Sequence, residues 1–317
     1  MAQLTDMVEV IEGAGQAVEE WAAANRARIA EGVEAKGGVL LRGFRAEAAE
    51  TAERVLAALD LELLDDAYWS TPRSGVSKKT FTATEYASAR SISLHSEMSY
   101  MKSWPRLVAF HAIIVAEEGG ETTISNVDAA TAEIGDVVEQ FASKGVIYQR
   151  THHAGVDIPW RKAYQTDSRD EVERIARDAG MEINWLANDV LQTRHAAQGC
   201  VASESGAPLY FNQSNLFHPA NLPPGAEAQL TQLFGKDFLP RNAFFGDGSP
   251  ISAEIVRRVN AAFDKGAYGV PWRPGDVFIV DNMRHAHGRR PFKGARKLHV
   301  AMATRHATPA RTPIAWN

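Results

Sequence analysis

Two short stretches, far apart in the sequence, carry side chains that could bind a metal ion. The first is His95-Ser96-Glu97, which lies where a predicted strand runs into a loop. Positions i and i+2 of a strand share a face, so the imidazole and the carboxylate could point at one divalent cation. With 10 histidines and 39 acidic residues in 317, about one His-x-Asp/Glu is expected by chance, and the sequence has one. Alone, this stretch is more typical of a hydrogen-bonded His and Glu without a metal.

The second stretch follows a predicted buried strand, Val277-Phe278-Ile279-Val280. His285 and His287 come shortly after it, where a ligand would be held rigidly. Because the two are separated by one residue, both would point to the same side of a strand. Six cations lie between positions 284 and 297, which is typical of a solvated basic patch or a phosphate-binding surface. Because Pro, Phe and Gly interrupt this run, Arg296 on the next predicted strand could instead clamp a small carboxylate with two parallel hydrogen bonds.

Composition leaves histidines and carboxylates as the only ligands for a metal. Cys200 is the single cysteine, so a disulfide framework and a Cys-rich zinc or iron–sulfur site are excluded. A lone thiol fits a reducing cytoplasm, and no neighbouring base predicts that this thiol is activated. The net charge of −5 disfavours a protein that binds nucleic acid through a basic surface.

No segment predicts export or insertion into a membrane. The N-terminus has acidic residues at Asp6, Glu9 and Glu12 where a secretory signal would have a cationic start. The longest apolar runs, such as Ala109 to Ala116, are far shorter than the roughly 18 residues needed to span a bilayer. We therefore expect a cytoplasmic protein with no nucleic-acid or membrane partner.

The elements that must position the candidate ligands are mostly short strands with helical inserts. Helices are predicted over residues 15–36 and 46–59, on either side of a buried strand at Val39-Leu40-Leu41. Segments rich in Thr, Ile, Val, Phe and Tyr predict strands at 91–98, 107–115, 122–125, 145–150, 209–212, 277–281 and 297–304. Further helices are predicted at 128–143, 167–179, 224–234 and 251–263. The pattern favours a mainly β fold, a sandwich or barrel with helical inserts in one domain, over a doubly wound sheet.

These residues, in this order, resemble the iron(II)/2-oxoglutarate-dependent oxygenases of the TauD/TfdA and clavaminate synthase-like superfamily. Within it, the chain looks most like the SyrP-type enzymes of bacterial natural-product pathways. The similar stretches span about two thirds of the chain and cover residues 94–100, 116–122, 210–213, 246–251 and 272–289. The resemblance implies a double-stranded β-helix core, the jelly-roll or cupin-like fold.

The resemblance also implies a domain organisation. The whole chain, 1–317, would be one oxygenase domain with N-terminal helical elements at about 15–60. The jelly-roll core would cover about 90–305 and carry a lid or insert at about 151–205.

Carried over to this sequence, the resemblance makes His95, Glu97 and His287 the ligands of Fe(2+). Three positions of an octahedron would stay open for 2-oxoglutarate and O2. His285 remains the alternative to His287, although the His-Gly-Arg context of His287 is the one that the family has.

The same resemblance assigns the co-substrate. Arg296 would bind the distal carboxylate of 2-oxoglutarate, with Arg289 or Arg290 as the alternatives, and Thr122 would add a hydrogen bond. The implied reaction converts 2-oxoglutarate to succinate and carbon dioxide while hydroxylating an unactivated C–H bond. Desaturation or cyclisation through the same cofactor chemistry remains open.

Glu97 also bears on the substrate. Related halogenases have a small residue at this position, so a glutamate disfavours halogenation. A glutamate in place of the commoner aspartate looks like the amino-acid oxygenases of the clavaminate synthase group. We therefore expect a small amino-acid-like substrate, free or bound to a carrier protein, and leave the oligomeric state open.

Several other residues are candidates for contact with the substrate. Asn212 and Gln213 follow an apolar strand, and either could bind a polar group or serve a structural turn. Met98 and Trp104 lie in a loop, 98–105, that could form a lid together with an insert at 151–166. More typical of structural roles are the pair His152-His153, expected on the surface, and three tryptophans expected in the core, Trp160, Trp185 and Trp272.

Two other classes of protein remain as alternatives. A zinc-dependent hydrolase could use the same His, Glu and His ligands with water at an open position. Arg296 argues against it, because hydrolysis needs no clamp for a keto acid. A non-catalytic jelly-roll binding protein is the second alternative, and the complete ligand set together with Arg296 disfavours it.

Overall fold

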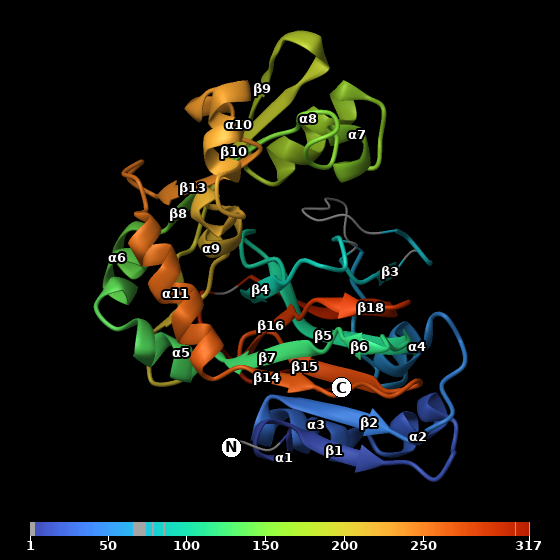
Figure 1. Ribbon diagram of the computed structural model, residues 1–317. Coiled ribbons are helices and arrows are strands. Elements are labelled where there is room, and N and C mark those ends of the chain that lie inside the picture. Colours follow the sequence, from blue (N-terminus) through green and yellow to red (C-terminus); the bar gives the residue numbers. More distant parts are fainter. Residues whose placement is uncertain (1–3, 66–73, 78, 85, 308, 317) are drawn as a thin grey trace.

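Two facing β-sheets form the core of the protein. The structure is a computed structural model, and it describes residues 4–65, 74–77, 79–84, 86–307 and 309–316 (Figure 1). The major sheet runs in the order β1 (Glu9–Glu12), β2 (Gly38–Arg42), β15 (Val277–Asp281), β5 (Trp104–Ile114), β18 (Lys297–His306) and β3 (Thr80–Thr82). The minor sheet runs in the order β14 (Tyr268–Val270), β7 (Thr122–Asn126), β16 (His285–Arg289) and β4 (Ile92–His95).

Successive side chains of the central strands point to opposite faces of the major sheet, and both faces are apolar. Phe110, Phe278 and Val300 face the minor sheet and pack with Ile124 of β7 in one buried cluster. Their neighbours in sequence belong to a separate buried cluster on the opposite face, which includes Leu107, Ala109, Ile279 and Ala301. This period of two is what a strand with both faces buried requires. The arrangement confirms the predicted mainly β jelly roll with helical inserts.

N-terminal helices cover the outer face of the major sheet (Figure 1). These helices are α2 (Val18–Ala24), α3 (Arg26–Lys36) and α4 (Thr51–Ala58), whereas α1 (Leu4–Met7) packs through Leu4 into the cluster of the other face. The predicted single helix over 15–36 is wrong, because it is divided at Asn25, whose φ of −126° is not helical. Helix α3 ends at Gly37 with a φ of 78°, a left-handed conformation that glycine adopts without strain. Strand β1, which pairs in parallel with β2, was not predicted.

A second lobe lies above the jelly roll in Figure 1. Its sheet runs in the order β13 (Arg241–Phe245), β8 (Val146–Thr151), β10 (Leu191–Ala197) and β9 (Glu182–Trp185). The insert predicted at 151–205 supplies β9 and β10, whereas β13 lies outside that range and β8 ends at its first residue, Thr151. The lobe also contains α7 (Trp160–Ala163), α8 (Arg169–Asp178), η1 (Ala187–Asp189), α10 (Ala226–Phe234) and η3 (Lys236–Phe238).

The remaining elements connect the two lobes. Helices α5 (Val127–Ile134) and α11 (Ala253–Lys265) pack beside the minor sheet, with α9 (Ser214–Phe217) and η2 (Pro219–Asn221) near them. Helix α6 (Val137–Lys144) packs against β11 and β12. Two short hairpins pair β11 (Cys200–Ala202) with β12 (Pro208–Tyr210) and β6 (Glu118–Gly119) with β17 (Phe292–Lys293). The single helix predicted over 128–143 is wrong, because Gly135, with a φ of 66°, separates α5 from α6. Among the described residues, no helix combines the length and apolar character needed to cross a membrane.

Candidate metal centre

The backbone register of the minor sheet brings the candidate ligands together. His95 at the end of β4 is the direct cross-strand partner of His287 on β16. Glu97 follows two residues later, and one ligand atom from each of the three side chains lies within 4.8 Å of the others. The Oε2 atom of Glu97 is 3.5 Å from Nε2 of His287. All three residues are buried.

The two imidazoles are oriented by their neighbours. Nδ1 of His95 lies 2.9 Å from the carbonyl oxygen of Ser93, so this nitrogen is the donor and Nε2 keeps a lone pair for a metal. The ring of His287 lies between the ring of His95 and the edge of Phe110, with centroid distances of 4.6 and 5.2 Å. Two imidazoles and one carboxylate around one point form the donor set that non-haem iron(II) uses, with further positions open.

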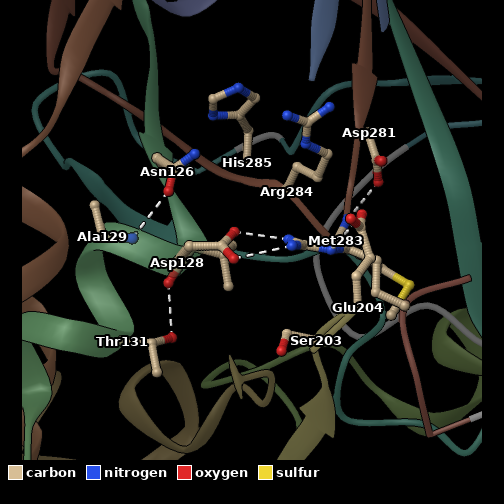
Figure 2. Close-up of polar contacts among 12 residues, drawn as sticks. Asn126, Asp128, Ala129, Thr131, Ser203, Glu204, Asp281, Met283, Arg284 and His285 are labelled. Carbon is tan, nitrogen blue, oxygen red and sulfur yellow. Dashed lines mark hydrogen bonds and ion pairs between the residues drawn. The ribbon is translucent and has the colours of Figure 1, made fainter. Parts of the chain in front are cut away.

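Glu97 is held through its backbone by Asn282. The Oδ1 atom of Asn282 accepts the Glu97 N–H at 2.6 Å, and its Nδ2 donates to the carbonyl oxygens of Glu97 and Pro105 at 2.8 and 2.9 Å. Asn282 is fully buried. It occupies the turn between β15 and β16, where the carboxylate of Asp281 accepts the N–H of Met283 at 2.9 Å (Figure 2). One buried amide therefore links the carboxylate ligand to the turn that precedes His287.

Two further buried side-chain amides form hydrogen bonds to the backbone of residues 94–96. Nε2 of Gln213 donates to the carbonyl oxygen of Ser96 at 2.7 Å, and Nδ2 of Asn215 donates to that of Leu94 at 3.1 Å. Sequence reasoning missed Asn215 entirely and assigned Asn282 no role. Their contacts join residues more than a hundred positions apart, for which the sequence carries no local signal.

His285 does not reach the triad. Its Nε2 lies 2.8 Å from the carbonyl oxygen of Lys36, at the C-terminal end of α3. Burial lowers its pKa below the ordinary value. Figure 2 shows His285 near Asn126, its cross-strand partner on β7. The structure thus places His287, and not His285, beside His95 and Glu97.

A cavity adjoins the three candidate ligands and contains the two residues expected to bind 2-oxoglutarate. Arg296 and Thr122 line it together with apolar residues from both sheets, Ile92, Phe110, Leu298 and Val300. Nε of Arg296 donates to the carbonyl oxygen of Gly120 at 2.8 Å, which fixes the guanidinium. Burial and the neighbouring Arg289 lower the pKa of Arg296 to about 10, while Glu121 acts in the opposite direction. Arg296 therefore stays charged near neutral pH.

Thr122 is oriented by Trp272. The indole Nε1 donates to Oγ1 of Thr122 at 3.1 Å, so the hydroxyl oxygen is an acceptor there and its proton is available to another partner. Trp272 and Trp160 are buried and Trp185 is partly buried against the core, as predicted.

The two alternative arginines have other contacts. Arg289 donates from its terminal nitrogens to four backbone carbonyls, those of Thr84, Tyr86, Ala87 and Arg90, at 2.7–3.4 Å. It therefore holds the segment that leads into β4. Arg290 is half exposed and lies 3.9 Å from Glu121. Arg289 and Arg296 both line the first cavity, but the terminal nitrogens of Arg289 bond to the backbone carbonyls, so Arg296 stays the predicted clamp for a carboxylate.

A second, larger cavity meets the first at Thr84, Ile92 and His95. It has about 1010 Å³ of empty space, including open solvent, and lies between the jelly roll and the second lobe. Gln213 lines it, but Asn212 does not: Nδ2 of Asn212 donates to the Gly199 carbonyl at 2.7 Å and its Oδ1 accepts a backbone N–H. Asn212 thus has the structural turn role.

Met98 and Trp104 do not line either cavity, contrary to their predicted contact with substrate. Trp104 begins β5 and is buried against Phe211, with ring centroids 4.8 Å apart. Met98 faces a third hollow beside α8, away from His95. The segment 98–105 is therefore partly strand and core, not a lid over the candidate ligands.

Two minor predictions have mixed outcomes. His152 is not on the surface: it is buried, with Nδ1 2.9 Å from the Ile158 carbonyl oxygen, and burial together with Arg150 lowers its pKa to about 3. Burial raises the pKa of Cys200 to about 12, which agrees with the prediction of an inert thiol.

Comparison with known proteins identifies the family. The model of the family described as "Taurine catabolism dioxygenase TauD, TfdA family" matches residues 2–302. The chain belongs to this family. This confirms the predicted superfamily, the dioxygenase class and its iron and 2-oxoglutarate. The zinc hydrolase and the non-catalytic binding protein are not supported.

Individual relatives agree with this placement in the TauD/TfdA family. The chain is 34% identical over 269 residues to the dapdiamide synthesis protein DdaC of Enterobacter agglomerans, covering 84% of this chain and 82% of the relative. Its fold is similar to that of PvcB from Pseudomonas aeruginosa, an Fe, alpha-ketoglutarate dependent oxygenase, at 18% identity and a TM-score of 0.52 over 93% of this chain and 85% of the other. An asparagine oxygenase with Fe(II), 3-hydroxyasparagine and succinate has a TM-score of 0.52 at 13% identity, over 90% and 78% of the two chains.

Proposed function

We propose that this protein is an iron(II)- and 2-oxoglutarate-dependent oxygenase that hydroxylates an amino acid or an amino-acid-derived substrate in a natural-product pathway. The observation that carries the proposal is one buried site with two parts. His95, Glu97 and His287 offer the ligands, and Arg296 and Thr122 lie in the adjoining cavity. The second cavity, which meets this one at His95, is the proposed place for the substrate.

The protein residues have distinct roles in this proposal. Bound iron would activate O2, which supplies the oxidising power, while 2-oxoglutarate is oxidised to succinate and carbon dioxide and the substrate gains the second oxygen atom. His95, Glu97 and His287 hold the metal, and Asn282 fixes the backbone of Glu97 by two hydrogen bonds. Arg296 pairs with the distal carboxylate of the keto acid. The Thr122 hydroxyl donates to the same group, because its oxygen is already occupied by Trp272.

The apolar lining of the first cavity serves the same chemistry. Phe110, Leu298 and Val300 are buried side chains that surround the cavity next to the candidate ligands. Excluding water from such a site protects a reactive species from side reactions and strengthens each polar contact in it. The second lobe covers the substrate side of the second cavity with Val156, Leu230 and Leu239.

The names of related proteins support the choice of substrate. DdaC is a dapdiamide synthesis protein, and this chain covers most of its length. The asparagine oxygenase shows that a similar fold can hold a hydroxylated amino acid. Delivery on a carrier protein is part of the proposal because the second cavity is roomy and open. Desaturation or cyclisation is the alternative outcome at the same site. The single domain over 1–317 and the cytoplasmic location remain predictions.

The experiment that tests this function is a screen for succinate release. Protein with iron(II) and 2-oxoglutarate is offered free amino acids and aminoacyl groups on carrier proteins, and products are analysed by mass spectrometry. We expect substrate-dependent succinate and the gain of one oxygen, whereas the loss of two hydrogens would identify the alternative. The absence of both succinate and the weak visible band of the anaerobic iron–keto acid complex would contradict the proposal.

A further inference from the structure

We infer that Gln213 determines specificity, because its side-chain oxygen accepts a hydrogen bond from the amino group of the substrate. The inference rests on the proposed function, since it takes the second cavity as the place of an amino-acid-like substrate. Gln213 lines this cavity together with His95. Its side chain is also bonded to the backbone of Ser96, which stands between the ligands His95 and Glu97. An amino group bound by Gln213 is therefore held on the side of the cavity that adjoins the candidate ligands.

The backbone of Gln213 is fixed in the wall of the cavity. Its N–H donates to the hydroxyl oxygen of Tyr148 at 2.8 Å. Its carbonyl oxygen accepts the N–H groups of Leu216 and Phe217, in α9, at 3.0 and 3.1 Å. The whole residue is 3% exposed. The side chain thus starts from a fixed point and is almost entirely enclosed by protein.

The side-chain amide of Gln213 has a partner at its nitrogen and none at its oxygen. Nε2 donates to the Ser96 carbonyl oxygen at 2.7 Å. The flipped amide would place Oε1 against that carbonyl, and two acceptors repel each other, so this contact fixes the orientation. Among the described residues, none donates a hydrogen bond to Oε1, and this oxygen is not sealed from solvent. It is therefore open to the cavity that Gln213 lines.

The other amide and carboxylate oxygens in the described part of the cavity wall already accept hydrogen bonds. The carboxylate of Asp157 accepts from two arginines and from one backbone N–H, at 2.8–3.1 Å. Oδ1 of Asn221 accepts from the side chains of Ser93 and Asn260, both at 3.1 Å. Gln213 thus supplies the wall with an unoccupied acceptor. A ligand that brings no donor leaves this buried oxygen unpaired, so the site discriminates between ligands by hydrogen bonding.

The amino group is the donor that all forms of an amino-acid-like substrate share. The carboxylate of a free amino acid only accepts hydrogen bonds, and on a carrier protein it becomes a thioester, which does not donate either. An ammonium group donates up to three hydrogen bonds, and its charge strengthens each of them. A fixed amide oxygen therefore recognises the same group whether the substrate is free or bound to a carrier.

Matched ligands that differ in the amino group test the inference. Protein loaded with iron(II) and 2-oxoglutarate is titrated anaerobically by calorimetry with the standard L-amino acids, both free and as thioesters of N-acetylcysteamine. The tightest binder is compared with its deamino analogue and with its N,N,N-trimethyl analogue, which keeps the charge but has no N–H. We expect it to bind at least about fivefold more tightly than either analogue. Equal binding of the deamino analogue, or no binding by any of these ligands, would overturn the inference.

Variants separate recognition of the amino group from support of Ser96. Gln213→Met loses both halves of the amide, and its preference for the amine should fall below about twofold. Gln213→Glu loses the amide donor to Ser96 but keeps an acceptor oxygen in either protonation state, so the preference should remain. Asn215→Ala is the matched control and should also keep it, because Asn215 bonds to the nearby Leu94 carbonyl but does not line the cavity.

Two results with the variants would contradict the inference. One is an equal loss of preference in Gln213→Met and Asn215→Ala, which would mean that Gln213 acts only through the backbone of residues 94–96. The other is a loss of preference in Gln213→Glu. The comparison of ligands on the unchanged protein needs no variant, so it remains a test if Gln213→Met does not fold.

The readouts separate this inference from the proposed function. Failure of the visible iron–keto acid band and of succinate release would contradict the oxygenase, whatever the analogues do. A normal band and succinate release, without discrimination between an amino acid and its deamino analogue, would contradict only the role of Gln213.

Discussion

His95 and His287 are direct partners across the antiparallel strands β4 and β16, and their ring centroids lie 4.6 Å apart. The hydrogen-bond register of a sheet therefore fixes the relative position of two of the three candidate ligands. Gly288 permits this close packing, because a Cβ at that position would lie 2.5 Å from the carbonyl oxygen of Ile92 on β4. The third ligand, Glu97, lies beyond the strand and depends on side-chain hydrogen bonds.

Replacement of Glu97 by alanine should abolish iron(II) binding and turnover. Two imidazoles remain in this variant, but the only carboxylate of the triad is lost. Anaerobic iron titration and succinate release measure the effect. Glu118→Ala, an exposed glutamate on β6, should behave as the unchanged protein does. Full activity in Glu97→Ala would rule out the assigned triad.

Replacement of Arg296 by alanine should weaken binding of 2-oxoglutarate. Loss of a charge-assisted hydrogen bond costs on the order of 1.5–3 kcal/mol, which corresponds to roughly 10- to 150-fold in the dissociation constant. The visible band titrated with 2-oxoglutarate gives this constant. Arg290→Ala, on the half-exposed arginine, should change it by less than a factor of about two. Equal affinity in the protein and in Arg296→Ala would move the clamp to another residue.

Replacement of Asn282 by alanine should loosen iron binding as well as the fold. The substitution leaves one N–H and two carbonyl groups without their buried partner, at a cost of about 1–3 kcal/mol for each. Asn212→Ala is the matched control, since this buried amide also bonds to backbone groups, at Gly199 and Ser214. Both variants should unfold at lower temperature, but only Asn282→Ala should weaken iron(II) binding, by at least tenfold. Equal iron affinities would show that Asn282 supports the fold alone.

Acidification should destabilise the protein through buried histidines. Burial, aided by the neighbouring His299, lowers the pKa of His111 from 6.5 to about 4, although a hydrogen bond to the Ala46 carbonyl opposes the shift. The unfolded chain then takes up a proton at higher pH than the native protein does. This contribution is fully present above about pH 6.5 and is lost as the pH falls towards 4, for a total of about 3 kcal/mol.

Urea unfolding at several pH values tests this acid sensitivity. His111→Gln should lower the slope of the unfolding free energy between pH 6.5 and 4. Burial also lowers the pKa of His195 to about 4. His195 should therefore contribute a similar pH dependence of the unfolding free energy, which remains in His111→Gln. A slope that is the same with and without His111 would contradict the assignment.

The sequence predicted those parts of the fold that have a local periodic signal. Strand β15 was predicted with its observed bounds, and β7 within one residue, because both are short apolar or β-branched runs. Strand β16 was missed, since His285–Arg289 is polar and becomes buried only between β4 and β7. Helix breaks at Asn25 and Gly135 were missed as well, because the apolar spacing continues through both positions.

The residues of the candidate site also include some that have a local signal in the sequence and some that have none. His95, Glu97, His287 and Arg296 belong to motifs that can be found along the chain, and the structure brings all four to one cavity. The contact of Asn282 with Glu97 joins residues 185 positions apart, so no spacing rule predicts it. Trp104 was assigned to a loop because its neighbours are polar, whereas the pairing of β5 with β18 makes it strand.

Asn282 couples the carboxylate ligand to the start of strand β5. Its amide binds the carbonyl oxygens of both Glu97 and Pro105, so one side chain fastens the two ends of the segment between them. The buried Ser99 and Tyr100 lie between these two ends and pack into the core of the second lobe. A change at position 282 would therefore release the carboxylate ligand and the start of β5 together, and would reach the second lobe through the segment between them.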